Sequence, residues 1–374
     1  MDGLIPFNRP YTSQRAPAAM ADAAERGHLS GDGHYTKVAS RLIQELTGVP
    51  HVLLTTSCTH ALEMCALLLG IGPGDEVIMP SFTFVSTANA FALRGARPVF
   101  VDIRADTFNI DERQIEAAIT ERTRAIVAVH YAGVACEMDE ISSIASKHGI
   151  PVIEDNAHGF GGSYRGTPLG SLGSLATLSF HETKNIQCGE GGALLINDGQ
   201  LLDAAEISRE KGTNRSRFFR GQVDKYTWVS LGSSYLPSDL LAAYLTTQLE
   251  EFDEIQKRRM LVWLRYRAEL PAWAASSGFS FQHCPDDREH PAHLFALLAP
   301  DLDTRQRFIA HLELAGVKAV FHYVPLHSSP MGHTFGERHL AVTDNIGERL
   351  VRLPLFPTLD DATVDFILSA VQAF

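Results

Sequence analysis

The stretch Pro151-Val152-Ile153-Glu154-Asp155-Asn156-Ala157-His158-Gly159 runs from a short apolar strand into a polar turn. A second stretch, Ser179-Phe180-His181-Glu182-Thr183-Lys184-Asn185, begins at the end of another strand of the same kind. Ligands of open α/β sheets bind beyond the carboxyl ends of the strands. Asp155, Ser179 and the turn after Leu54 all fall at such strand ends, so we expect them to converge on one crevice.

Short apolar strands alternate with helical patterns through the first 200 residues. The expected strands are Val52–Leu54, Glu76–Met79, Pro98–Val101, Ala125–His130, Pro151–Asp155, Ala176–Ser179 and Gly192–Ile196. Helical patterns between several of them cover Ala61–Leu69, Ile115–Ile119 and Ile141–Lys147. This alternation predicts an α/β fold, a doubly wound and mostly parallel sheet with helices on both faces.

The pattern changes beyond about residue 246. A long charged helix is expected from Gln248 to Leu270, followed by short elements that Pro and Gly residues interrupt. An amphipathic helix from Asp361 to Phe374 ends the chain. We therefore predict two domains: a large one over residues 1–245, with an N-terminal arm, and a smaller α+β domain over residues 246–374.

The bulk composition excludes several classes of protein. The 374 residues carry a net charge of −12, which argues against binding to nucleic acid or anionic membranes. No apolar run approaches the roughly 20 residues of a membrane span. Five scattered cysteines without a CxxC pair indicate neither a disulfide framework nor a metal site. The first residues lack the basic and apolar regions of a signal peptide, so we expect a cytoplasmic location.

Lys184 and Asp155 carry the central chemical argument. Taken alone, Lys184 is expected at the surface, since lysine is almost never buried without a partner, and Asp155 is expected to cap a helix. Together they are the pair that a pyridoxal phosphate (PLP) enzyme needs. The amine forms a Schiff base with the cofactor aldehyde, and the carboxylate keeps the pyridine nitrogen protonated so that the ring accepts electrons.

Other residues at strand ends suit the same flat, phosphorylated cofactor. The turn Ser57-Cys58-Thr59 leads into a helix, where free N–H groups and hydroxyls bind an anion, although ordinary N-capping is the alternative. Ser179 offers another hydroxyl. Phe84 could stack on a heterocycle or belong to the core, and His158 could contact the ring or be structural.

The order and spacing of these segments resemble the DegT/DnrJ/EryC1/StrS sugar aminotransferases, PLP enzymes of fold type I that act on nucleotide-linked keto sugars. The resemblance covers nearly the whole chain and is strongest to the dTDP-4-oxo-6-deoxyglucose 4-aminotransferases. The segments that carry it are Leu29–Gly33, His130–Cys136, Ser179–Asn185, Lys211–Arg215 and Arg220–Trp228, of which the last is the most specific.

The resemblance implies a seven-stranded sheet between helices, PLP as cofactor, and a homodimer with shared active sites. It makes Lys184 the Schiff-base lysine, Asp155 the partner of the pyridinium nitrogen, Phe84 the stacking ring and His158 a neighbour of the ring oxygen. The phosphate-binding positions that it implies are Ser179, Cys58 and Thr59, of which the last two follow Ser57 at the same helix start. Many relatives add an asparagine from the neighbouring subunit in a Gly-x-Asn-x-Arg segment. Here Ser234 replaces that Asn and Leu236 replaces the Arg.

The substrate follows from the same resemblance. It implies transfer of an amino group from an amino acid, L-glutamate, to the C4 ketone of a dTDP-4-keto-6-deoxyhexose, giving a dTDP-4-amino-4,6-dideoxy sugar. His322 and His327 match a segment near the substrate. A basic cluster could contact the diphosphate across a dimer interface or form a solvated loop. Its members are Arg215, Arg220 and Lys225, with Arg217 beside them.

Four other functions compete with this one. A 3-keto sugar aminotransferase and a noncatalytic PLP-binding sensor stay open. A PLP-dependent sugar dehydratase is disfavoured because it is expected to lack Lys184. A nicotinamide-dependent dehydrogenase is disfavoured because no GxGxxG follows the first strand.

Overall fold

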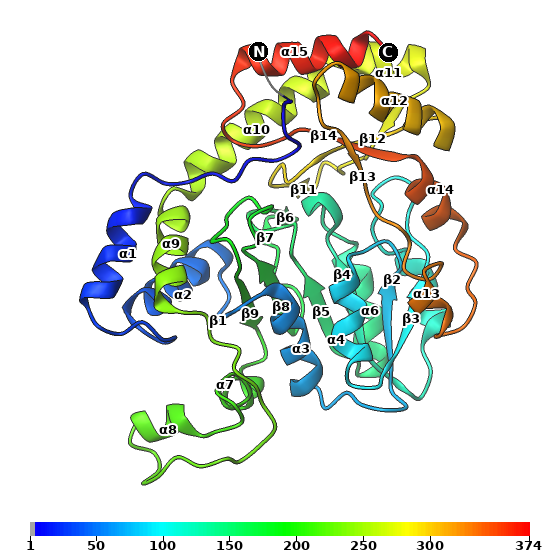
Figure 1. The fold of residues 1–374 in the computed structure, drawn as a ribbon. Helices are drawn as coiled ribbons and strands as arrows, with labels where there is room; N and C mark the ends of the chain where they lie inside the picture. The colour runs from blue at the N-terminus through cyan, green and yellow to red at the C-terminus, as the bar shows by residue number, and fades with distance from the viewer. Residues whose placement is uncertain (1–3) are drawn as a thin grey trace.

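A seven-stranded sheet lies at the centre of the larger part of the computed structural model, which describes residues 4–374 (Figure 1). Residues 1–3 of the predicted large domain lie outside this range. The strand order is β1-β9-β8-β5-β4-β2-β3, and only β9 runs antiparallel to its neighbours. The strands are β1 (His51–Thr55), β2 (Glu76–Pro80), β3 (Arg97–Val101), β4 (Thr123–Val129), β5 (Val152–Asp155), β8 (Leu175–Ser179) and β9 (Gly192–Ile196). All seven predicted strands are present, and the α/β fold is confirmed.

Helices cover both faces of this sheet, because its strands turn apolar side chains to both sides. On one face, a core that includes Val127 and Ile153 packs against α3 (Cys58–Leu68), α4 (Val85–Ala92) and α7 (Leu202–Arg209). On the other face lie α2 (His34–Thr47), α5 (Ile115–Ala118), α6 (Met138–His148) and α9 (Asp239–Glu250), and α1 (Ala16–Glu25) packs against α9. The predicted layering is therefore correct.

A second core lies in the C-terminal part, around an antiparallel sheet of order β10-β12-β14-β13. Its strands are β10 (Ser280–Phe281), β12 (Phe295–Leu298), β13 (Val320–Phe321) and β14 (Leu350–Leu353). Its helices are α10 (Phe252–Glu269), α11 (Pro271–Ser277), α12 (Leu302–Leu314) and α15 (Asp361–Gln372). The smaller helices α13 (Pro330–His333) and α14 (Ala341–Arg349) precede β14 in sequence. A short three-stranded sheet joins β11 (Arg288–Glu289), β6 (Ser163–Tyr164) and β7 (Thr167–Pro168). The C-terminal helix begins at Asp361, as predicted.

The long helix predicted from Gln248 to Leu270 is instead two helices, α9 and α10, which meet at Glu251. There the Glu251 carboxylate accepts hydrogen bonds from Tyr11 (2.8 Å) and Ser13 (2.7 Å) of the N-terminal segment. These contacts come from residues distant in sequence, so the local helical pattern does not contain them. Among residues 4–374, no helix combines the length and the apolar character needed to cross a membrane.

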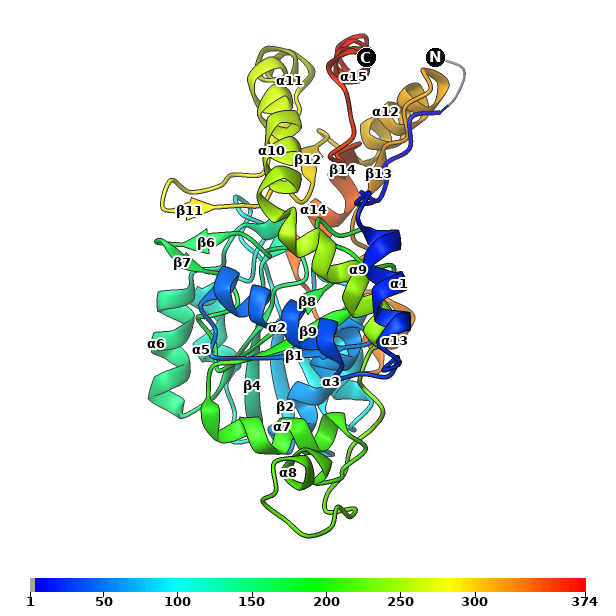
Figure 2. The same ribbon diagram turned by 90° about the vertical axis from the view of Figure 1, so that its left-hand side faces the viewer.

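The predicted boundary between residues 245 and 246 lies inside α9. Leu249 of α9 and Ile255 of α10 pack with Leu54 and Leu178 of the large sheet, so this core continues beyond the predicted boundary. Figure 2 shows α10 running from there to the C-terminal sheet and its helices. The division into two domains stays a prediction.

Strand β5 turns its two consecutive acids to opposite sides of the sheet. Glu154 is completely buried, and Nε2 of His130 donates a hydrogen bond to its carboxylate at 2.9 Å. The carboxylate also accepts backbone N–H groups at 2.7–2.8 Å from Gly170, Leu172 and Gly173. These bonds replace water around a buried charge and fix the loop that precedes β8. Asp155, the next residue, faces a pocket.

We expect Glu154→Gln to lower the free energy of unfolding by about 2–3 kcal/mol. The reason is that an amide NH₂ group would then face a backbone N–H group at a buried position. Urea-induced unfolding followed by circular dichroism measures the change. Glu140→Gln, at an exposed position of α6, is the matched control and should unfold like the wild type. Equal midpoints for Glu154→Gln and the wild type would contradict this structural role.

Candidate active site

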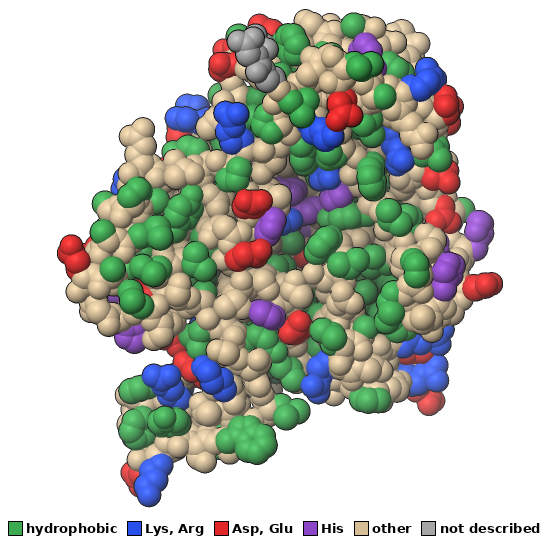
Figure 3. Space-filling view, viewed as in Figure 1, with side chains coloured by type: hydrophobic (Ala, Val, Ile, Leu, Met, Phe, Trp, Pro, Cys, Tyr) green, Lys and Arg blue, Asp and Glu red, His purple; other side chains and the backbone are tan. Residues whose placement is uncertain are grey.

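A pocket of about 630 Å³ opens between the carboxyl ends of the large sheet and the C-terminal sheet. Figure 3 shows it as a hollow in the middle of the face, with basic and histidine side chains inside. The turn after β1, the end of β5 and the turn after β8 all contribute to its lining. From the C-terminal sheet come Val320, Arg352 and Leu353. The strand ends therefore converge as the sequence predicted.

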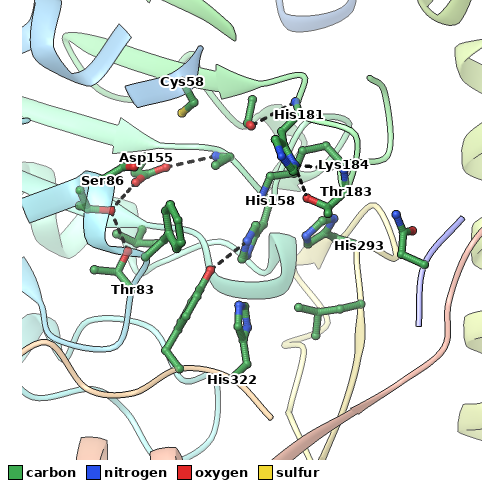
Figure 4. A pocket seen from close by; sticks show the side chains of 18 of the residues that line it. Cys58, Thr83, Ser86, Asp155, His158, His181, Thr183, Lys184, His293 and His322 are labelled. Atoms are coloured by element: carbon green, nitrogen blue, oxygen red, sulfur yellow. Dashed lines mark hydrogen bonds between the residues drawn. The ribbon is translucent and has the colours of Figure 1, made fainter. Parts of the chain in front are cut away.

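Lys184 lies in the turn after β8, and its backbone N–H donates a hydrogen bond to the carbonyl of His181 at 2.9 Å. Its side chain lines the pocket (Figure 4). Burial lowers the pKa of the Lys184 amine to about 8, although the nearby carboxylate of Asp155 opposes this shift. An amine with such a pKa is partly neutral near pH 7, so it can attack a carbonyl or accept a proton.

Asp155 lies buried at the end of β5, and burial raises the pKa of its carboxyl. Its Oδ2 accepts a hydrogen bond from the hydroxyl of Thr87 at 2.7 Å, and its Oδ1 accepts the N–H of Ala157 at 3.3 Å. The hydroxyls of Thr83 and Thr87 are 2.8 Å apart. These bonds fix the orientation of the carboxylate, but no basic side chain of residues 4–374 forms an ion pair with it. A cationic ring nitrogen would supply the missing charge.

The start of α3 forms an anion-binding turn. Ser57 caps the helix, because its Oγ accepts the N–H of His60 at 3.1 Å, and the hydroxyls of Thr59 and Ser86 are 2.8 Å apart. The first N–H groups of any helix have no partner within the helix and attract a phosphate. Strand β9 approaches closely here: a Cβ on Gly192 would lie 2.4 Å from the backbone of this turn, so only glycine fits.

Aromatic side chains form another wall of the pocket. Phe84 is 57% exposed although it is apolar, and it lies 6.4 Å from Tyr323 between ring centroids. His158 stacks on His293 at 4.3 Å and is 3.3 Å from the hydroxyl of Tyr323 (Figure 4). Burial lowers the pKa of His158 well below its usual value, so its imidazole is neutral. A flat aromatic ligand can stack on such a surface.

His322 lines the pocket as well, and its Nδ1 is 2.9 Å from the hydroxyl of Tyr131. His327, from the same predicted segment, does not line it. His327 is buried between Ser81, 2.7 Å from its Nδ1, and Asp344, 3.2 Å from its Nε2. The two predicted histidines are therefore in different surroundings.

Four other predicted residues also lie outside the pocket lining of this chain: Ser234, Arg215, Arg220 and Lys225. They belong to residues 211–234, here named the α8 arm after its helix α8 (Arg215–Phe219). Figures 1 and 2 show this arm projecting away from the two sheets. Arg220 forms an ion pair with Glu206 at 2.7 Å. The site roles of these residues stay predictions.

Several residues of the pocket were not predicted from the sequence. Thr87 could have been found, because it lies three positions after Phe84 at the start of the same helix. The others come from the C-terminal part. Tyr323 lies beside His322 in the segment that the resemblance places near the substrate, whereas no motif marks His293 and Arg352 as pocket residues.

The pocket suits PLP by its own chemistry. It combines a half-buried amine, a buried carboxylate without a paired cation, a helix start suited to a phosphate and an exposed aromatic ring. Each of these features corresponds to a different part of that cofactor: the aldehyde, the ring nitrogen, the phosphate and the ring face. The residues present therefore fit the group.

Comparison with known proteins also indicates an aminotransferase. The family model of the DegT/DnrJ/EryC1/StrS aminotransferase family matches residues 11–372. The spore coat polysaccharide biosynthesis protein SpsC of Bacillus subtilis is 34% identical, over 99% of this chain and 96% of SpsC. The aminotransferase TlmJ from Streptoalloteichus hindustanus superposes with a TM-score of 0.91 at 29% identity, over 99% of this chain and 98% of TlmJ.

Spr1654 from Streptococcus pneumoniae, in its PLP form, superposes with a TM-score of 0.90 at 28% identity, over 99% of this chain and 98% of that one. The same protein has also been solved in a pyridoxamine phosphate form, which matches with a TM-score of 0.91. The predicted fold type and the predicted cofactor are confirmed by these matches. The chain therefore belongs to the DegT/DnrJ/EryC1/StrS aminotransferase family and is a PLP-dependent sugar aminotransferase.

Proposed function

We propose that this enzyme transfers an amino group from L-glutamate to the C4 ketone of a dTDP-4-keto-6-deoxyhexose in the cytoplasm. The product would be a dTDP-4-amino-4,6-dideoxy sugar. The observation that carries the aminotransferase chemistry is the placement of Lys184 and Asp155 in one pocket, with an amine of lowered pKa. The identity of the sugar is supported by the resemblance of Arg220–Trp228 and the other quoted segments to the 4-aminotransferases.

Different side chains of the pocket would have different roles in this reaction. When bound, PLP supplies an electron-withdrawing ring that stabilises negative charge on the α-carbon of the donor. Asp155, oriented by Thr87, would hold the proton on the ring nitrogen. The amine of Lys184 would take the α-proton from the donor and later return a proton, for which a pKa of about 8 is well suited.

The remaining contacts would hold the cofactor in place. Ser57, Cys58, Thr59 and Ser179 surround the start of α3 and would bind the phosphate. Phe84 would cover one face of the ring, and His158 would lie beside it. Because Lys184 is present and lines the pocket, transamination is favoured over dehydration.

We also propose a homodimer with shared active sites. The α8 arm exposes large apolar side chains that a monomer would leave in water: Trp228 is 74% exposed, and Phe219 and Leu231 are exposed as well. Exposed apolar surface of this kind is typical of a protein–protein interface. A second copy of the chain would cover the arm, and the arm could then bring Ser234 and its basic residues to the partner's pocket.

The first experiment follows the colour of the bound cofactor. Addition of L-glutamate should bleach the visible absorption, and dTDP-4-keto-6-deoxyglucose should restore it, with NMR of the product showing an amino group at C4. Lys184→Ala should bind PLP but abolish turnover, because the proton carrier is lost. Lys147→Ala, an exposed lysine of α6, is the matched control. Wild-type turnover in Lys184→Ala would refute the mechanism, and recovery of the visible absorption with a 3-keto sugar but not with dTDP-4-keto-6-deoxyglucose would refute the 4-keto substrate.

Asp155→Ala should lower kcat at least about a hundredfold, since charge stabilisation in the transition state would be lost. Thr87→Val should lower kcat about tenfold, because it removes one hydrogen bond to the same carboxylate. Steady-state rates with L-glutamate measure both effects. Thr246→Val is the control, since its hydroxyl bonds only to the carbonyl of Ala242 in its own helix. An unchanged rate for Asp155→Ala would remove its proposed role.

The α8 arm should recognise the nucleotide sugar. The double variant Arg220→Gln/Lys225→Gln should raise KM for the keto sugar about tenfold, because contacts to its diphosphate would be lost, with a smaller change for L-glutamate. Initial rates at varied concentrations of each substrate separate the two values. Arg41→Gln, an exposed arginine of α2, should change neither. Similar KM changes for both substrates would argue against sugar recognition by the arm.

A further inference from the structure

His293, just before strand β12, lines the pocket with one ring nitrogen hydrogen-bonded and the other free. Its Nδ1 is 2.9 Å from Oδ1 of Asn185, the residue that follows Lys184. Its Nε2 forms no hydrogen bond within residues 4–374, yet it is not a fully buried atom and is therefore accessible from the pocket. Figure 4 shows this imidazole next to that of His158, on which it stacks at 4.3 Å.

The amide of Asn185 fixes the tautomer of His293. Its Nδ2 donates hydrogen bonds to the carbonyl of Pro291 at 2.7 Å and to Oε1 of Gln256 at 3.0 Å, which leaves Oδ1 as the acceptor. Nδ1 of His293 must therefore carry the proton that it donates to this oxygen. In a neutral imidazole the other nitrogen, Nε2, then has no proton and is a hydrogen-bond acceptor.

The surroundings of His293 keep its imidazole neutral. Burial lowers the pKa of His293 well below its usual value, and the positive charges of Lys184 and Arg352 lower it further. Carboxylate and phosphate oxygens are also acceptors, so neither the carboxylates of an amino acid nor the diphosphate of a nucleotide sugar can bond to an unprotonated Nε2. The group that binds there has to be an O–H or an N–H donor.

The two proposed substrates differ in the donor groups that they bring. L-Glutamate has one such group, its amine, which must react with the cofactor at Lys184. The keto sugar has hydroxyls at C2 and C3, and the C3 hydroxyl is attached to the carbon beside the reacting ketone. Because the ketone must also reach the cofactor, the C3 hydroxyl enters the same pocket. His293 is bonded to the residue after Lys184, so it lines this part of the cavity.

We propose that Nε2 of His293 accepts a hydrogen bond from the C3 hydroxyl of the keto sugar, an inference that rests on the proposed 4-aminotransferase function. His293 thereby selects sugars with a hydroxyl beside the reacting ketone, because a sugar without it leaves Nε2 unpaired. Asn185 is a positioning residue, since it determines which ring nitrogen carries the proton. The C2 hydroxyl is the other donor of the sugar ring, and the experiment distinguishes the two.

The test follows the recovery of visible absorption when dTDP-4-keto-6-deoxyglucose is titrated into the aminated enzyme. His293→Phe keeps a flat ring but removes both nitrogens, and it should raise the apparent Kd for this sugar at least about tenfold. The apparent Kd for L-glutamate, measured by bleaching of the PLP form, should stay within about twofold. His339→Phe, at an exposed position, is the matched control. Equal apparent Kd values for the sugar in His293→Phe and the wild type would overturn the proposal.

Two further variants separate the roles of the two ring nitrogens. The side chain of His293→Gln can place an amide oxygen near the position of Nε2, so the apparent Kd for the sugar should stay within about threefold of the wild type. The shorter side chain of His293→Asn reaches only the position of Nδ1, so it should weaken sugar binding as much as His293→Phe. The opposite order would overturn the proposal, because the bond to Asn185 would then be the one that matters.

Two analogues of the keto sugar identify the hydroxyl. The 3-deoxy analogue should bind the wild type about tenfold more weakly than the parent sugar, whereas His293→Phe should bind both equally. With the 2-deoxy analogue, the ratio between His293→Phe and the wild type should be the same as with the parent sugar. An equal penalty for the 3-deoxy analogue in both proteins would overturn the assignment, as would loss of that ratio with the 2-deoxy analogue.

Failure of this inference is distinguishable from failure of the proposed function. A wild-type enzyme whose absorption the keto sugar does not restore would refute the proposed substrate. Calorimetric titration of the PLP form with the same sugar needs no turnover, and equal Kd values for the wild type and His293→Phe would refute the role of His293. Absence of binding to the wild type in that titration would overturn both. Unchanged visible absorption of each variant before titration shows that it is folded and binds its cofactor.

Discussion

The buried carboxylate of Asp155 is the constraint on which the site depends. Burial penalises its charge, and the structure offers hydrogen bonds from Thr87 and Ala157 but no paired cation within the described chain. A carboxylate in this state favours a ligand that brings its own positive charge. The protonated nitrogen of a pyridine ring is such a charge. Helix α4 contributes to this state, because it carries the threonine that orients the carboxylate.

Two consecutive residues of strand β5 have different roles: Glu154 stabilises the fold, and Asp155 faces the pocket. The alternation of β5 directs Glu154 into the fold, where it has a complete set of donors, and directs Asp155 into the pocket, where it does not. The two side chains belong to the same chemical type and differ only in what surrounds them. The contrast shows that hydrogen-bond saturation, rather than burial alone, distinguishes a structural acid from a functional one.

The features predicted correctly from the sequence are those that depend on short local patterns of residues. The seven strands of the large sheet are short apolar runs, and the positions of Asp155 and Lys184 follow from where two of these runs end. The break at Glu251 was not predicted, because the residues that contact it lie some 240 positions away. Arg352 and His293 were missed for a similar reason: they reach the pocket through the packing of the C-terminal sheet, and no nearby pattern marks them.

The walls of the pocket belong to two different hydrophobic cores. Lys184 and Asp155 come from the large sheet, whereas Arg352 and His322 come from the C-terminal sheet and its connections. A ligand that contacts both walls links these cores and therefore stabilises the arrangement seen in the structure by its own binding free energy. Binding of a substrate should therefore make the two cores more rigid relative to one another. A rotation of one core against the other would therefore change the width of the cavity between them.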